Sequence, residues 1–254
     1  MKKLIGVLMM LVVYTTTVIG QTNETINILF LGNSYTYYNG VPSIVSDMGL
    51  QKGKKIVVTQ ITRGGSLLDT YANTDFILET INKYKFNYVV LQEQSTSPLF
   101  AAEEKTYPAI RKLDKEIRKN GGQTVLYMTW AREYADSIGT KMLPGKFYYD
   151  VFDSFDTAQD SLAASYNKIG KEINAKVAPA GLAWKAFHKM HPDVSLWRSD
   201  HSHPLEIGSV IAAYSIYKTI FNEPVSGIKS PLPISKEYEK DIVEITDKLV
   251  PCNK

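Results

Sequence analysis

The sequence predicts an α/β protein with a mostly parallel sheet that is covered by helices on both faces. Short apolar segments alternate along the chain with longer segments of helical spacing. Most of the short segments are apolar throughout, as expected for strands that are buried on both faces. The chain has 254 residues, of which 44% are hydrophobic and 22% are charged. This composition suits one compact domain with a substantial core and excludes a disordered or fibrous protein.

The expected elements follow one another in a regular order. The predicted strands are residues 26–31, 55–61, 88–91, 124–129 and 175–179. The predicted helices between them are residues 42–52, 68–84, 102–119 and 157–174. An apolar run at 207–221 follows Pro204, which suits the first turn of a helix, and a last helix over 235–249 should pack away from the chemistry. Residues 131–155 show no clear hydrophobic periodicity, which predicts a long irregular excursion of the chain above the sheet.

The first twenty residues have the layout of a signal peptide. Lys2 and Lys3 precede an apolar run of about 11 residues and a Thr-rich stretch. The run is shorter than the roughly 20 residues that a permanent membrane helix needs. We therefore expect cleavage near Gly20, a single mature domain over 21–254, and a secreted or periplasmic bacterial protein. An uncleaved membrane anchor is the alternative.

Charge and cysteine content exclude several classes of function. The formal net charge is +3, and it falls to +1 once Lys2 and Lys3 are removed. Nucleic-acid binding is not expected from so small a charge. Cys252 is the one cysteine and stands near the C-terminus, so it builds no intrachain disulfide, zinc pair or buried catalytic thiol.

The chemistry of a parallel sheet is expected outside the carboxyl ends of its strands. Gly32-Asn33-Ser34-Tyr35-Thr36 follows the first strand directly. A serine on this turn can project into the crevice, while the start of the following helix supplies amide donors to a developing anion. An ordinary turn is the alternative interpretation.

A second candidate segment lies near the end of the chain, at Ser199-Asp200-His201-Ser202-His203-Pro204. Asp200 stands three residues before His203 on one loop, so its carboxylate can orient the imidazole while the other ring nitrogen faces a serine. A capping loop with exposed histidines is the alternative.

Together the two segments resemble the SGNH (GDSL-type) hydrolase superfamily. That superfamily carries its serine in a Gly-Asp-Ser block and its other catalytic residues in a C-terminal Asp-x-x-His block. The resemblance covers most of the mature chain and is closest to a bacterial branch whose first block reads Gly-Asn-Ser. It implies a three-layer α/β/α sandwich with a parallel, flavodoxin-like sheet of about five strands.

The resemblance also implies roles for individual residues. Ser34 would be the nucleophile, His203 the general base and then acid, and Asp200 the residue that orients His203. The oxyanion hole would combine Ser34 with Gly65, from Arg63-Gly64-Gly65-Ser66 after the second strand, and Gln94. The third block departs from the family's Gly-x-Asn-Asp, because this chain has Gln92-Glu93-Gln94-Ser95, which could also be only a polar strand end.

Three further residues are expected to contact substrate. Asn33 replaces the usual aspartate and removes one negative charge beside the nucleophile. Trp130 and Arg132 follow the fourth strand, together with Glu133, and are predicted to line the pocket as a sugar-stacking face and polar contacts. A buried Trp with solvated charges is the alternative.

The predicted function is hydrolysis of an ester through an acyl-enzyme on Ser34, with removal of short acyl (acetyl) groups from a carbohydrate. The substrate is a small-molecule or glycan ester, no cofactor or metal is required, and no membrane contact is expected after signal cleavage. One alternative is a glycan-binding protein without turnover, suggested by the altered third block. The other is a metal hydrolase, in which His201 and His203 on an extended segment bind an ion together with Asp200 or His191.

Overall fold

The computed structural model describes residues 24–133 and 152–252. Its centre is a sheet of five strands, all parallel, in the order β2-β1-β3-β4-β5. The strands are β1 (Ile26–Gly32), β2 (Ile56–Thr62), β3 (Tyr88–Leu91), β4 (Gln123–Tyr127) and β5 (Lys176–Ala178). This is the flavodoxin-like order, so the predicted fold class is confirmed.

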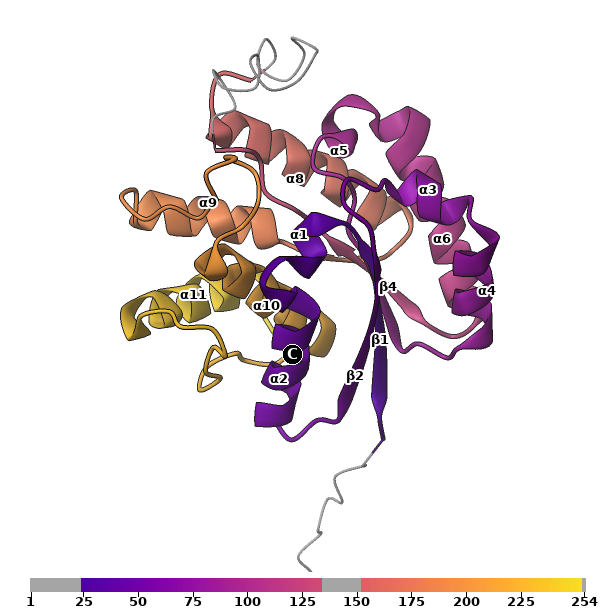
Figure 1. The fold of residues 1–254 in the computed structure, drawn as a ribbon, viewed down its shortest axis with the longest axis horizontal. Coiled ribbons are helices and arrows are strands. Elements are labelled where there is room, and N and C mark those ends of the chain that lie inside the picture. The colour runs from indigo at the N-terminus through magenta and orange to yellow at the C-terminus, as the bar shows by residue number, and fades with distance from the viewer. Residues whose placement is uncertain (1–23, 134–151, 253–254) are drawn as a thin grey trace, which may run out of the picture.

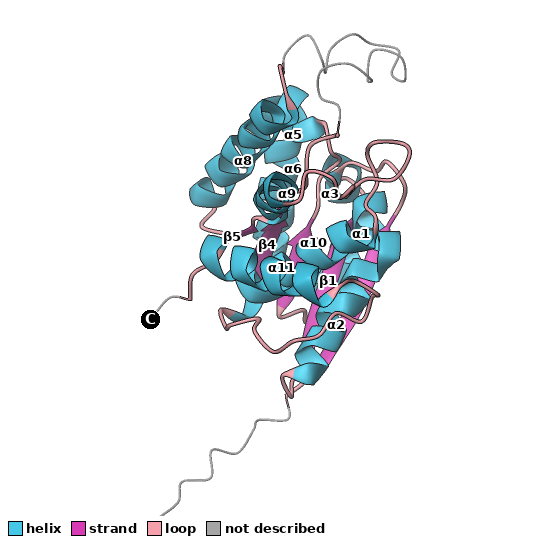
Figure 2. Cartoon of the chain, turned by 90° about the vertical axis from the view of Figure 1, so that its left-hand side faces the viewer, coloured by secondary structure: helices cyan, strands magenta, loops and turns pink. Residues whose placement is uncertain are grey.

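Helices cover both sides of the sheet (Figure 1). On one side, α10 (Glu206–Phe221) packs against α2 (Val41–Gln51), α9 (Ala180–Met190) and α11 (Lys236–Leu249). Figure 2 looks onto this side, with α2, α10 and α11 in front of the strands. The helices of the other side are α3 (Leu68–Ala72), α4 (Asp75–Lys83), α6 (Tyr107–Lys119) and α8 (Phe155–Glu172).

The strand register aligns the carboxyl ends of the central strands. Leu31 of β1 pairs with Leu91 of β3, and Leu91 pairs with Leu126 of β4. All three side chains are fully buried, because helices cover the sheet on both faces. The loops that follow β1 and β3 therefore leave the sheet side by side, at the point where the strand order reverses.

Several element boundaries differ from the sequence prediction. The segment 68–84 forms two helices, because Asn73 ends α3 by donating from its side chain to the carbonyl of Asp69, and Thr74 is extended. Residues 102–119 begin with a π-helical turn (Ala102–Thr106) before α6. Helix α8 begins two residues early at a capping box of Ser154 with Thr157. Helix α9 was not predicted at all.

Helix α10 begins at Glu206 instead of at Pro204. Pro204 forms an antiparallel bridge with Trp197 and lies outside the helix. Helix α11 begins after its N-cap Ser235 and packs on α9 and α10, as expected for a terminal helix.

Two predictions concern residues that the structure does not describe. The expected signal peptide, residues 1–20, lies outside the described residues, as do residues 134–151 of the expected excursion. Within the described ranges, no helix has both the length and the apolar character that crossing a bilayer requires.

Candidate active site

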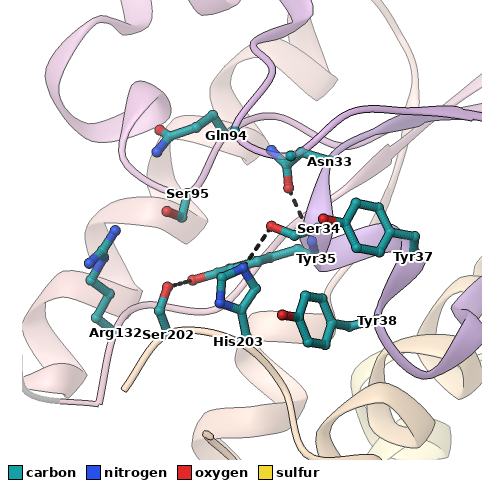
Figure 3. A pocket seen from close by; sticks show the side chains of 12 residues that line it. Asn33, Ser34, Tyr35, Tyr37, Tyr38, Gln94, Ser95, Arg132, Ser202 and His203 are labelled. Carbon is teal, nitrogen blue, oxygen red and sulfur yellow. Dashed lines mark hydrogen bonds between the residues drawn. The ribbon is translucent and has the colours of Figure 1, made fainter. Parts of the chain in front are cut away.

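A cavity of about 350 Å³ lies at the carboxyl ends of β1 and β3. Five short segments contribute its lining, and they are far apart in the sequence (Figure 3). They are residues 33–38 without Thr36, residues 64–65 and 94–95, Arg132, and residues 202–203. The two predicted blocks, after the first strand and before the late helix, therefore meet at one place.

Ser34, His203 and Asp200 form a hydrogen-bonded series at this cavity. The Nε2 atom of His203 lies 2.8 Å from the Oγ atom of Ser34, although 169 positions separate the two residues. The Nδ1 atom of His203 lies 2.6 Å from Oδ2 of Asp200. This arrangement can transfer a proton from a hydroxyl to an imidazole whose tautomer is set by a carboxylate.

The backbone of Asp200's own loop holds its carboxylate in place. Oδ1 accepts hydrogen bonds from the backbone N–H groups of Ser202 at 3.0 Å and His203 at 2.9 Å. Partial burial acts to raise the pKa of Asp200, but the hydrogen bonds from His203 and Ser202 outweigh it and hold the pKa below its usual value. The carboxylate is therefore charged at neutral pH and suited to support an imidazolium.

The turn that carries Ser34 depends on a glycine and on a buried glutamine. A Cβ atom on Gly32 would lie 2.4 Å from Oγ1 of Thr36 and 2.6 Å from Oε1 of Gln92. That Gln92 oxygen accepts from the backbone N–H of Asn33 at 2.7 Å and from the Thr36 hydroxyl at 2.8 Å. Gln92 is fully buried. The sequence alone indicates only a polar strand end at Gln92, because its partners lie on the distant turn that follows β1.

Asn33 joins the serine turn to the loop that carries Gly65. Its Oδ1 accepts from the backbone N–H of Tyr35, and its Nδ2 donates to the carbonyl of Ser66 at 3.1 Å. An aspartate could not donate this second bond, which gives a physical reason for asparagine at this position. Asn33 lines the cavity, as predicted, but it is only 3% exposed. The helix after it, α1 (Ser34–Tyr37), is a single turn.

Gly65 and Gln94, the two predicted partners of the oxyanion hole, both line the cavity. Gly65 has a φ of 69°, and a Cβ atom there would contact nothing within 4 Å, so the backbone conformation favours glycine. The Oε1 atom of Gln94 accepts from the backbone N–H groups of Thr96 and Ser97. Figure 3 shows the Gln94 side chain extending away from Ser34. Only its Nε2 atom is left to donate toward substrate.

Trp130 does not line the cavity, and its predicted role as a sugar-stacking face is wrong. Its side chain is fully buried and lies parallel between Tyr35, at 4.5 Å, and Trp184, at 4.0 Å between ring centroids. Its Nε1 donates to the carbonyl of Ser202, and the Tyr35 hydroxyl lies 2.6 Å from the Ser202 hydroxyl. Trp130 therefore anchors the loop between Asp200 and His203.

The aromatic wall of the cavity comes from two tyrosines that were not singled out in the sequence. Tyr38 stacks on the imidazole of His203 with ring centroids 4.5 Å apart. Tyr37 stacks on Tyr38 and is 40% exposed. Both tyrosines follow Ser34 on the same short segment. The sequence signal that could have identified this aromatic wall was therefore a pair of aromatic residues just after a candidate nucleophile.

Arg132 lines the cavity, as predicted, whereas Glu133 lies outside the lining set. Glu133 is paired with His201, with Oε2 2.7 Å from Nδ1, and its backbone N–H donates to the His201 carbonyl. His201 has a φ of 57°, in the left-handed region, so residues 201–203 are not extended. The geometry assumed for the metal-hydrolase alternative is therefore wrong.

The candidate metal ligands contact different partners in the structure. His191 lies 2.8 Å from Asp241, between α9 and α11, while His203 faces Ser34 and Asp200. Across residues 24–133 and 152–252, no group of three or more His, Cys, Asp or Glu side chains could hold a metal ion.

Glu93 is a fully buried carboxyl group that directly precedes Gln94 of the cavity lining. Its Oε1 accepts from the backbone N–H groups of Leu68, at 3.0 Å, and Gln94, at 2.7 Å. Its Oε2 is buried and has no hydrogen-bond partner in the described part of the chain. Burial raises the pKa of Glu93 to about 7. Through Oε1, Glu93 therefore connects the first residue of α3 with the segment after β3.

Solved structures of similar fold include SGNH hydrolases. A DUF4886 family protein from Bacteroides uniformis gives a TM-score of 0.73 at 18% identity, over 91% of this chain and 97% of that chain. A candidate SGNH hydrolase from Slackia heliotrinireducens gives 0.61 at 22% identity, over 78% and 100%. A mutant of an acetyl-xylooligosaccharide esterase from Geobacillus gives 0.55 at 14% identity, over 81% and 97%. The chain therefore has the fold of SGNH hydrolases.

No protein-family model matches this sequence, and neither does any curated protein.

Proposed function

We propose that this chain is a serine ester hydrolase that removes short acyl groups, above all acetyl, from a carbohydrate. The observation that carries the proposal is the 2.8 Å distance between Ser34 Oγ and His203 Nε2 at the wall of the cavity. Asp200, 2.6 Å from the other ring nitrogen, completes a nucleophile, base and orienting group. The SGNH hydrolase fold supports the same reaction class.

The proposed reaction proceeds through an acyl-enzyme. His203 accepts the proton of the Ser34 hydroxyl as Oγ forms a bond to the ester carbonyl carbon. The tetrahedral intermediate then collapses, the bond to the alcohol oxygen breaks, and His203 returns the proton to the leaving alcohol. Water next attacks the acyl carbon while His203 takes its proton, and the bond to Ser34 Oγ then breaks as His203 returns that proton to Oγ and the acid is released. Asp200 stabilises the imidazolium in both halves of the reaction.

The oxyanion would accept hydrogen bonds from the backbone N–H groups of Ser34 and Gly65, with Nε2 of Gln94 as the third donor. Loss of one such donor typically costs about 2.7–4 kcal/mol of transition-state stabilisation. Because Oε1 of Gln94 is bound to Thr96 and Ser97, the third donor has less freedom to reach the oxyanion. This contact favours the second candidate function, a glycan-binding protein without turnover.

Two observations support a carbohydrate ester as the substrate. Tyr37 presents a partly exposed aromatic ring at the cavity, and aromatic rings offer an apolar surface with a polar edge to ligands. One protein of the same fold is an acetyl-xylooligosaccharide esterase. The cavity of about 350 Å³ accommodates a short acyl group together with part of a sugar.

A serine-directed phosphonate probe followed by mass spectrometry tests the reaction class. We expect an adduct on Ser34 and burst acylation with p-nitrophenyl acetate, both abolished in Ser34→Ala. Ser161→Ala on α8, outside the cavity, is the matched control and should keep both. No adduct, under conditions that label a known serine hydrolase, would favour glycan binding without turnover. Activity that survives Ser34→Ala and is lost with a chelator would favour a metal hydrolase.

We also propose that residues 1–20 are removed on export to the periplasm or the medium. Intact mass measurement of the mature protein should give an N-terminus near residue 21. A membrane-bound protein that keeps Met1 would contradict this proposal and favour the uncleaved anchor.

A further inference from the structure

The lining of the cavity is positively charged. Of the described residues that line it, Arg132 is the only one with a permanent charge, and none is acidic. A second arginine lies next to this lining, since the guanidinium of Arg198 is 5.4 Å from the ring centroid of Tyr38. Arg63 directly precedes Gly64 of the lining in the sequence. Such a cavity favours ligands with a negative charge.

The cavity has two chemically different sides about Ser34. Figure 3 shows Tyr37 and Tyr38 on one side, and Arg132 with Ser95 and Gln94 on the other. The guanidinium of Arg132 points toward Ser95 and Gln94. A cation together with a hydroxyl and an amide is a poor surface for a long acyl chain and a good one for a polar, charged group.

The nearby carboxylates already have other partners. Glu133, next in sequence to Arg132, is paired with His201 at 2.7 Å, and Asp200 is paired with His203 at 2.6 Å. The Nε atom of Arg132 is buried and finds no hydrogen-bond acceptor among residues 24–133 and 152–252. Within the described ranges, no protein acceptor at Nε therefore competes with a ligand for the Arg132 guanidinium.

We propose that Arg132 binds a carboxylate of the substrate, so that the preferred substrates are esters of acidic molecules with the carboxylate close to the scissile bond. The planar guanidinium can donate two parallel hydrogen bonds to a carboxylate. The Ser95 hydroxyl, on the same side of the cavity, supplies a further donor to this anion. This inference rests on the proposed ester hydrolysis and adds its substrate class.

Two pairs of esters test the charge preference and show which part of the substrate carries the carboxylate. The first pair, an acetylated methyl glucuronoside and the matching acetylated methyl glucoside, places the charge on the alcohol. The second pair, p-nitrophenyl hemisuccinate and p-nitrophenyl butyrate, places it on the acyl group. We expect kcat/KM to be about tenfold or more higher for the charged member of at least one pair, because charge-assisted hydrogen bonds have this magnitude.

The variant Arg132→Gln should lose the preference, and Arg132→Lys should keep part of it, because lysine retains the charge but not the paired donors. Arg111→Gln is the matched control, since Arg111 is an exposed arginine of α6 paired with Glu172. Equal kcat/KM within both pairs, or a preference that survives Arg132→Gln, would overturn the inference while leaving ester hydrolysis intact.

A binding measurement separates this inference from the proposed reaction. If wild type hydrolyses none of the esters, the proposed function is contradicted, and the charge preference is measured by calorimetry with Ser34→Ala. That variant should bind an oligosaccharide of glucuronic acid at least about tenfold more tightly than one of glucose, and Ser34→Ala with Arg132→Gln should not. Equal affinities would overturn the inference.

Discussion

The ring of Tyr38 lies against the imidazole of His203, with centroids 4.5 Å apart and planes at 28°. Tyr38 follows Ser34 by four residues, and His203 lies on the distant loop before α10. The segment that carries the candidate nucleophile therefore also supports the candidate base. Aromatic contacts of this kind contribute about 0.5–1.5 kcal/mol beyond the area they bury.

Tyr38→Ala should lower kcat by about two- to tenfold with little change in KM, because the imidazole loses the surface that orients it. Steady-state kinetics with p-nitrophenyl acetate measure this effect. Tyr38→Phe keeps the ring and should restore most of kcat. An equal loss in the Phe variant would show that the hydroxyl, and not the stacked ring, matters.

Asp200→Asn should lower kcat by about 10³- to 10⁴-fold, as expected when the group that sets the imidazole tautomer is lost. The amide can still accept the backbone hydrogen bonds of Ser202 and His203, which are now made to Oδ1. Circular dichroism should therefore show an unchanged fold. A variant with nearly full activity would remove Asp200 from the proposed mechanism.

Folding stability should fall between about pH 4.5 and pH 7 because of Glu93. The pKa of Glu93 is raised from 4.5 to about 7 by burial, so the folded state binds a proton that the unfolded state has lost in this window. The stability linked to this proton is present below pH 4.5 and lost as the pH rises through 7, on the order of 3 kcal/mol.

Urea unfolding of wild type and Glu93→Gln at pH 4.5 and pH 8 measures this linkage. The neutral amide can accept from Leu68 and Gln94 as the carboxyl does, so the variant should lose less stability at pH 8. An identical pH dependence in both proteins would contradict the assignment to Glu93.

Gly32→Ala should destabilise the protein by about 1–3 kcal/mol, because the new Cβ would lie 2.4 Å from Thr36 and 2.6 Å from Gln92. Thermal unfolding measures the loss. Gly64→Ala is the control, since its Cβ would be 3.4 Å from the Tyr37 hydroxyl, an ordinary contact. Similar Tm values for the two variants would show that the turn can move to accept the methyl group.

The sequence alone predicted the strands, the fold class and the two segments that meet at the cavity. Apolar runs identify buried strands without knowledge of their neighbours, and a parallel sheet brings the ends of its strands together. Asp200 and His203 stand three residues apart, so their contact is a local one that spacing can predict. The resemblance to SGNH hydrolases pointed to Ser34 as the partner of His203.

Only the tertiary structure decided which neighbouring side chains support these residues. Trp130 was predicted to stack on a sugar because it is an aromatic residue that follows the fourth strand. Its ring is instead buried between Tyr35 and Trp184, which lie on other elements. Gln92 supports the Ser34 turn across two strands, and Tyr38 supports His203. Periodicity and spacing report on neighbours along the chain, whereas burial and hydrogen-bond partners depend on which distant segments the folded chain brings together.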